Sequence, residues 1–244
     1  MSVLPPTPLT PQQRAIFWIV ALVCAASRLL AEARSLWDWD EALFCLAMRD
    51  YDVTLHHPHP PGFPAYIAMA KLVRIFVSSD FRALQTINLI AAMLVFPAMF
   101  LLARELRLRF PTALSAAVLF AFFPNVWFFG GGAFSDIPSI VLVVFAAALL
   151  LRGQRDPSTS LRAGRNAYWL GTFLLAIAIG IRPQNILVGL VPGILATRRR
   201  RLSEIVIALL IGVVVVGVAF GDAHVVLERA GGLDRAAEGD ADDH

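Results

Sequence analysis

The sequence predicts an all-α protein: a polytopic transmembrane helix bundle of about seven spans with a long helical first extracytoplasmic loop. Of its 244 residues, 58% are hydrophobic and only 16% are charged, and the mean hydropathy is +0.68. A water-soluble domain usually has about 45–50% apolar and about 25% charged residues. This composition excludes a disordered chain, a coiled coil and an ordinary soluble enzyme. The two cysteines exclude a disulfide-stapled secreted scaffold.

Seven apolar segments are candidates for the spans, because a membrane crossing needs about 20 mostly apolar residues. We expect these spans at 14–33, 83–103, 111–129, 137–151, 168–181, 186–197 and 204–220. A further apolar stretch, 63–77, contains Lys71 and Arg74. It therefore predicts an interfacial helix whose cations lie at the lipid headgroups.

The first segment has a second interpretation, as a cleaved signal peptide. Residues 31–33 read Ala-Glu-Ala, which resembles a small-residue cleavage site. However, Arg14 is the single base before the apolar stretch, which favours an uncleaved span.

Arginine-rich loops predict the orientation of the bundle. Segments 104–109, 152–165 and 198–201 carry most of these arginines. They alternate with 130–136, which has no Lys or Arg, and with 182–185, which has one. Because basic loops stay in the cytoplasm, the N-terminus is predicted to be cytoplasmic and the two poorly charged loops extracytoplasmic.

The formal charge of +3 combines two unlike parts of the chain. Residues 1–220 carry 19 basic and 11 acidic residues, whereas 221–244 carry seven acidic residues and two arginines. The segment 221–244 is polar and lacks periodicity, so we expect a disordered tail. The rest divides into a cytoplasmic segment, 1–13, and a transmembrane domain, 14–220, whose first outer loop is 34–82. Apolar runs of this length exclude a nucleic-acid-binding protein.

The densest polar stretch follows the first span and reads Trp37-Asp38-Trp39-Asp40-Glu41. Asp38 and Glu41 have the spacing of a capping box at a helix N-terminus, and the two tryptophans suit the interfacial aromatic belt. Neither interpretation accounts for Asp40. Adjacent carboxylates point in different directions on a helix, so Asp40 is the candidate to face a substrate.

Three histidines, His56, His57 and His59, lie in a segment with four prolines between positions 58 and 64. Proline fixes the backbone and excludes helix there, which suits a rigid surface. The histidines are not spaced as a helical i, i+4 pair and no cysteine lies nearby, so a metal site is disfavoured. We expect them to hydrogen-bond an anionic headgroup or a substrate.

Asp136 and Arg182 stand at the outer ends of two predicted spans. Asp136 or the preceding Ser135 can cap the span that follows, and Arg182 can extend its cation to the headgroups. The functional alternative for Arg182 is pairing with a lipid phosphate.

These features occur in an order that resembles a known family. An outer loop opens with Asp40-Glu41 and continues with His59-Pro60-Pro61, and later segments supply Ser135-Asp136 before Pro138 and then Arg182-Pro183. Over residues 14–200 the chain resembles the GT-C superfamily of polytopic glycosyltransferases, in the branch of protein O-mannosyltransferases and lipid A aminoarabinose transferases. It is most similar to their bacterial dolichyl-phosphate-mannose-type relatives. Members are usually longer, so we expect a truncated member.

The resemblance implies transfer of a sugar from a polyprenyl-phosphate donor to an acceptor hydroxyl outside the cytoplasm, with inversion. It implies Asp40 as catalytic base, supported by Glu41. It also implies His59, Asp136 and Arg182 as substrate-binding residues, with Asp136 beside the acceptor and Arg182 beside the phosphate. From the histidine cluster itself we expect the same role for His57. The implied partners are membrane lipid, the lipid-linked donor and an acceptor glycan, lipid or protein. No cofactor or metal is implied, and the expected location is a bacterial inner or plasma membrane.

The residues suit this chemistry independently of the resemblance. A hydroxyl that attacks an anomeric carbon needs a base within hydrogen-bond reach, and a departing phosphate needs a cation. The main alternative is a multi-span transporter or permease subunit. Transporters place ionisable groups near the membrane midplane, whereas the predicted span centres here are nearly free of charge.

Overall fold

The computed structural model describes residues 7–153, 161–197 and 200–217, and these are mainly helical. Within these ranges no β-strand forms, and a lone bridge joins Asp52 to His57. The all-α prediction is confirmed. In the part of the chain that the structure describes, three helices are long and apolar enough to cross a membrane: α1 (Pro11–Leu30), α4 (Asp80–Glu105) and α7 (Asp136–Gly153).

The predicted count of seven spans is not confirmed, because the remaining apolar helices are shorter or more polar. α5 (Phe110–Ala121), α9 (Asn185–Thr197) and the helix Leu202–Gly217 are apolar but have fewer than 18 residues. α8 (Leu161–Ile181) has 21 residues. Its first turns contain Arg162 and Arg165, so its apolar part is shorter than the helix.

The predicted span 111–129 is wrong as a single helix. α5 ends at Ala121, and α6 (Pro124–Phe129) starts again at Pro124. Proline has no backbone N–H and disfavours helix at the residue before it, which separates the two helices.

The predicted first outer loop, 34–82, contains α2 (Trp39–Ala47) and α3 (Pro64–Arg74) before α4 begins at Asp80. The helix expected at 63–77 is therefore present as α3. Its buried side chains include Tyr66 and Ile67, which join a cluster with α2 and α4, whereas Lys71 is exposed. The predicted loop is thus compact helical structure packed onto the bundle.

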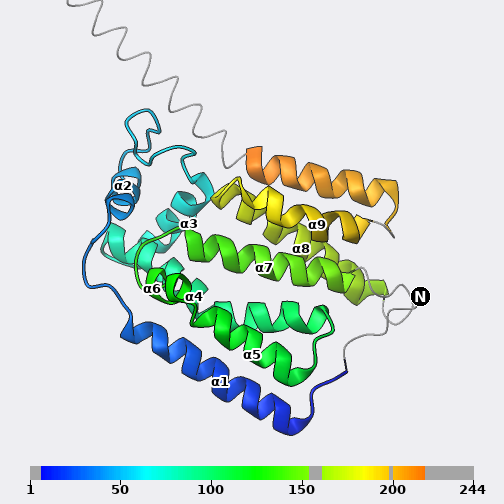
Figure 1. Ribbon diagram of the computed structural model, residues 1–244. Coiled ribbons are helices and arrows are strands. Elements are labelled where there is room, and N and C mark those ends of the chain that lie inside the picture. Colours follow the sequence, from blue (N-terminus) through cyan, green and yellow to red (C-terminus); the bar gives the residue numbers. More distant parts are fainter. Residues whose placement is uncertain (1–6, 154–160, 198–199, 218–244) are drawn as a thin grey trace, which may run out of the picture.

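Successive long helices run in opposite directions, so the connections between them gather at two ends of the bundle (Figure 1). We call one the loop end, made of residues 31–63, 130–135 and 182–184. The other is the arginine end, made of residues 104–109, 152–153, 164–165 and 200–201. This grouping matches the alternation of the arginine-rich loops with segments 130–136 and 182–185 in the sequence. The predicted tail 221–244 lies outside the described residues.

The centre of the bundle is α7, which contacts α4, α8 and α9. On the other side of α4, α5 packs through Ala113, Ala117 and Ala121, which are fully buried. Their i, i+4 spacing places these small side chains on one face, so the two helices approach closely. This packing holds the ends of several helices in register and so positions the loop end.

Candidate functional site

The N-terminus of α2 positions Asp40. Asp38 caps this helix and accepts a hydrogen bond from the Asp40 N–H at 2.9 Å, while Glu41 Oε2 accepts from the Asp38 N–H at 3.4 Å. The predicted capping box is confirmed. The Asp40 side chain is 43% exposed and its Oδ1 lies 3.7 Å from His59 Nδ1, so this carboxylate faces a histidine and solvent.

Glu41 is completely buried and is held by backbone donors. Its Oε2 accepts from the Trp37 N–H at 2.9 Å, and its Oε1 accepts from the Ala133 N–H at 2.7 Å. A buried carboxylate with such partners joins two chain segments firmly. Glu41 therefore fixes the start of α2 against the segment before α7, and it acts on Asp40 by positioning it.

Two amide side chains of α4 hold the glycine-rich segment before α7. Gln85 Nε2 donates to the carbonyls of Ala33 at 2.7 Å and Gly131 at 2.8 Å. Asn88 Nδ2 donates to the carbonyls of Phe129 and Gly132, at 2.6 and 2.7 Å. We did not predict these residues, although two buried amides three positions apart in an apolar span are themselves a signal.

Close packing explains the glycines at 131 and 132. A Cβ atom at Gly131 would overlap the carbonyl oxygen of Ala31, and one at Gly132 would lie 2.6 Å from Glu41 Oε1. Only a residue without a side chain fits such approaches. The segment is thus a buried support for the loop end, and not a phosphate-binding loop.

Asp136 and Arg182, which stand 46 positions apart in the chain, form an ion pair. Arg182 follows the end of α8, and its Nη2 donates to Asp136 Oδ2 at 2.6 Å. Its Nε donates to Ser135 Oγ at 3.0 Å, and 20% of its side chain is exposed. The predicted acid and the predicted cation therefore meet each other at the loop end.

Phe63 connects this ion pair to the Asp40–His59 pair. The guanidinium carbon of Arg182 lies 5.3 Å from the centroid of the Phe63 ring, and the His59 ring centroid lies 4.9 Å from it. Phe63 is buried and has a left-handed backbone with a φ of 48° and a ψ of 44°. Such a conformation costs a non-glycine residue on the order of 1 kcal/mol, and the surrounding contacts must hold it.

The contacts form one continuous set that we call the loop-end set: Asp40, His59, Phe63, Arg182 and Asp136. Asp40 and Asp136 also interact electrostatically. Tyr66, which interacts electrostatically with Asp136 and Arg182, is fully buried, and this burial raises the pKa of its phenol well above the usual value. Tyr66 therefore stays neutral and adds no charge to the set.

His57 is not brought to the loop-end set by any contact among the described residues. Its Nδ1 lies 3.6 Å from Asp50 Oδ2, and its backbone pairs with Asp52 in both directions. The predicted substrate-binding role of His57 therefore gains no geometric support. Across residues 7–153, 161–197 and 200–217, no group of three or more metal-ligating side chains is arranged to hold an ion.

The loop-end set combines a half-exposed carboxylate, an imidazole and a guanidinium. Such a set can accept a proton, orient a hydroxyl and stabilise an anion. Comparison of the chain with protein-family models, with curated proteins and with solved structures finds no match.

Proposed function

We propose that this chain is an integral membrane glycosyltransferase that moves a sugar from a polyprenyl-phosphate donor to an acceptor hydroxyl, with inversion. The observation that carries the proposal is the loop-end set. It draws Asp40, His59, Asp136 and Arg182 from three distant parts of the sequence into one run of contacts.

In the proposed reaction, Asp40 is the base. Its carboxylate takes the proton of the acceptor hydroxyl while the hydroxyl oxygen forms a bond to the anomeric carbon. On the opposite face of the sugar, the bond from the anomeric carbon to the phosphate oxygen breaks, and the electron pair leaves with the polyprenyl phosphate. A base must reach its proton, and the 43% exposure of Asp40 supports this role. His59, 3.7 Å away, orients the carboxylate.

Arg182 is the proposed cation for the departing phosphate. Its hydrogen bonds to Asp136 and Ser135 account for two of the five N–H donors of a guanidinium. The other donors suit a phosphate, because arginine offers them in a planar fork. Asp136 fixes the position of this guanidinium. Its additional role beside the acceptor stays a prediction.

The proposal includes an orientation. We place the loop end on the extracytoplasmic face and the arginine end in the cytoplasm of a bacterial inner or plasma membrane. The alternation of helix directions and the concentration of arginines at one end support this arrangement (Figure 1). The apolar faces of the helices explain why an enzyme that uses a lipid-linked donor is embedded in the membrane.

The experiment measures radiolabelled transfer in membranes that contain the full chain. The donors are polyprenyl-phosphate mannose and polyprenyl-phosphate aminoarabinose, the two classes that the resemblance implies. We expect Asp40→Asn to lower the rate by at least about 100-fold, because general-base catalysis contributes roughly 10²–10⁴-fold. The matched control is Asp50→Asn, which removes an exposed carboxylate from the same outer segment and should leave the rate unchanged.

Equal transfer by wild type and Asp40→Asn would remove Asp40 from the mechanism. Absence of transfer from both donors, together with solute movement by the protein in liposomes, would replace the enzyme with a transporter. A transporter would not require the carboxylate and the guanidinium to meet at one end of the bundle.

A further inference from the structure

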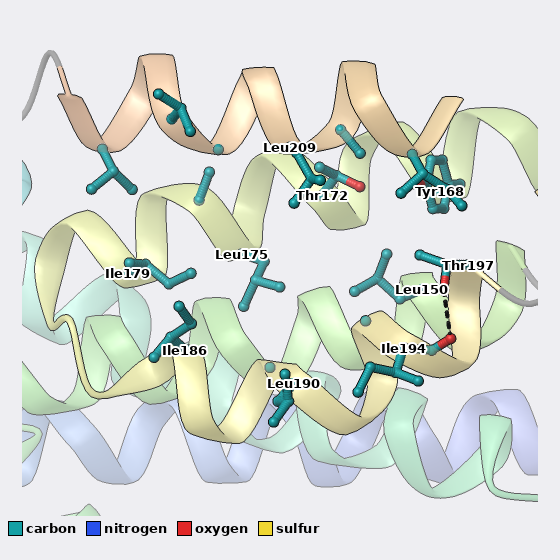
Figure 2. A pocket seen from close by; sticks show the side chains of 18 residues that line it. Leu150, Tyr168, Thr172, Leu175, Ile179, Ile186, Leu190, Ile194, Thr197 and Leu209 are labelled. Carbon is teal, nitrogen blue, oxygen red and sulfur yellow. Dashed lines mark hydrogen bonds between the residues drawn. The ribbon is translucent and has the colours of Figure 1, made fainter. Parts of the chain in front are cut away.

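A large apolar groove lies between α8, α9 and the helix Leu202–Gly217, away from the loop-end set. Its volume is about 520 Å³, within the range of small-molecule sites. Figure 2 shows aliphatic side chains of all three helices facing it, among them Leu175, Leu190 and Leu209. These side chains exclude a polar ligand and suit a hydrocarbon chain.

Two polar side chains of the groove lie at one of its ends. Tyr168 and Thr197 line it toward the start of α8 and at the end of α9, Thr172 lies about one turn further along α8, and Ile179 and Ile186 line the opposite end (Figure 2). By the course of the helices, the polar end is the arginine end and the purely aliphatic end is the loop end. The groove therefore has the polarity of a lipid whose headgroup lies at the arginine end.

One arginine contacts this polar end, and two more lie close to it in the chain. The guanidinium carbon of Arg200 lies 4.5 Å from the centroid of the Tyr168 ring, and Arg165 and Arg201 are exposed nearby in the chain. Arg200 also donates to the carbonyl of Gly153 at 2.6 Å and lies 3.7 Å from Glu204. In this part of the chain the three arginines outnumber the single carboxylate, that of Glu204. The net positive charge favours an anionic headgroup.

The length of the groove matches one lipid leaflet. Along α9 it extends from Ile186 to Thr197, and a rise of about 1.5 Å per residue gives roughly 16 Å. The hydrocarbon core of a bilayer is about 30 Å thick, so each leaflet contributes about half of that. A single acyl chain that starts at the arginine end has about this length, so it would fill the groove and end beside Ile179 and Ile186.

We propose that this groove is a binding site for an anionic phospholipid of the leaflet at the arginine end. One acyl chain lies along α8 and α9, and the phosphate lies beside Arg200 and Arg201. The tail of a lipid-linked sugar donor is a poorer occupant, because its phosphate would have to lie at the opposite end of the molecule. This site is independent of the transfer reaction at the loop end.

Replacing two glycines by larger residues tests the site by filling the groove. Gly193 and Gly212 line it, and a Cβ atom at either would meet nothing within 4 Å. Leucine at both positions should occupy the space of the acyl chain without a steric clash. Gly217 is a matched control, because its Cβ would also meet nothing within 4 Å but it does not line the groove.

The experiment uses purified full-length chain reconstituted in an equimolar mixture of phosphatidylglycerol and phosphatidylcholine. Native mass spectrometry then counts the lipids retained after transfer to detergent. We expect wild type and Gly217→Leu to retain phosphatidylglycerol preferentially. We expect the double variant Gly193→Leu, Gly212→Leu to lose at least about tenfold in retention, since it excludes several methylene groups from the groove.

Charge variants test the headgroup. Replacing Arg165 and Arg201 by Gln should lower the preference for phosphatidylglycerol over phosphatidylcholine by about fivefold for each arginine. Arg34→Gln, an exposed arginine at the loop end, should leave the preference unchanged. Equal retention by the filled variant, or no preference between the two lipids in wild type, would overturn the proposal.

A measurement on the wild-type chain removes dependence on the folding of variants. Phosphatidylglycerol with a photoreactive group in its acyl chain should label residues of α9 and of the helix Leu202–Gly217. Labelling confined to the exposed face of α1, which includes Trp18 and Leu22, would refute the site. Displacement of the label by polyprenyl monophosphate, or a crosslink to a second copy through the groove, would also refute it.

Discussion

Arginines occur at both ends of the bundle, and Arg182 at the loop end and Arg104 at the arginine end have partners of different kinds. At the loop end, Arg182 pairs with the Asp136 carboxylate and lies over Phe63. At the arginine end, Arg104 donates to the carbonyls of Thr7 and Leu108, at 2.6 and 2.9 Å. Carbonyls at helix ends are the groups that arginine ordinarily satisfies for structural reasons. The difference teaches that a guanidinium paired with a partly exposed carboxylate suits a candidate site, whereas a guanidinium that mainly satisfies backbone carbonyls is structural.

The largest expected effect separates these two arginines directly. We expect Arg182→Gln to lower sugar transfer by about 10²–10³-fold, the usual cost of removing one group that stabilises charge in a transition state. Arg104→Gln should lower stability, because it leaves two carbonyls without their donor, while transfer per folded molecule stays unchanged. Transfer rates normalised to folded protein measure this difference. Equal losses of transfer in both variants would erase the distinction between the two ends.

The buried glycine segment gives the next largest effect, on stability. Gly131→Ala places a Cβ atom against the carbonyl of Ala31, and we expect a loss of about 1–3 kcal/mol in the free energy of unfolding. Gly217→Ala, at a position with open space, serves as the control and should be close to neutral. Thermal unfolding in detergent measures both variants. An unchanged midpoint of thermal unfolding for Gly131→Ala would show that the backbone at the loop end can shift to accommodate the added Cβ atom at little cost.

A smaller effect should appear in acid at the loop end. The hydroxyl of Thr54 donates to Asp52 at 2.6 Å and lowers the pKa of this carboxyl below its usual 3.8, helped by backbone N–H groups. The ionised form is thus favoured by folding. Its stabilising contribution is present above pH 3.8 and is lost as the pH falls through the lowered pKa. Unfolding measured at neutral pH and below pH 3.8 should show this loss.

Thr54→Val supplies the comparison for the acid experiment. The variant removes the hydroxyl donor, so the pKa of Asp52 should rise toward its usual value. The difference in stability between neutral and acidic conditions should then shrink. A variant whose pH dependence equals that of wild type would remove Asp52 as the cause.

The smallest effect concerns the reactivity of Cys45 on α2, close to the loop-end set. Burial, and then the charges of Asp80 and Glu41, raise the pKa of its thiol to about 11. The thiolate is the reactive form, so alkylation of a Cys24→Ser variant should be slow at neutral pH and should accelerate toward pH 11. Mass spectrometry of maleimide labelling measures the rate. Rapid labelling at neutral pH would mean that α2 opens readily.

Local sequence signals predicted the features that depend on neighbouring residues. Asp38 and Glu41 have the spacing of a capping box, and the box forms as expected. The break between α5 and α6 also has a local sequence signal, which is Pro124. The prediction of a single span at 111–129 did not take this proline into account. The lengths of the apolar helices were harder to predict from the sequence. In α8, for example, Arg162 and Arg165 in the first turns make the apolar part shorter than the helix.

The candidate site residues could be identified from the sequence for a different reason. Polar side chains are costly in an apolar chain, so the few that occur near span ends, such as Asp40, Asp136 and Arg182, attract attention without any structure. The contact partner of each residue could not be predicted from the sequence. His57 and His59 look equivalent in the sequence, yet their imidazoles lie beside different carboxylates, Asp50 and Asp40.

By itself, the sequence determined that this chain is helical and rich in segments that suit a membrane, because composition and local spacing control those properties. It also determined which residue types were available for chemistry. Tertiary structure alone decided that Arg182 meets Asp136, that Phe63 connects them to His59, and that three helices enclose an apolar groove. Each of these depends on helices that are distant in the chain and packed at a particular angle, and no local pattern records that packing.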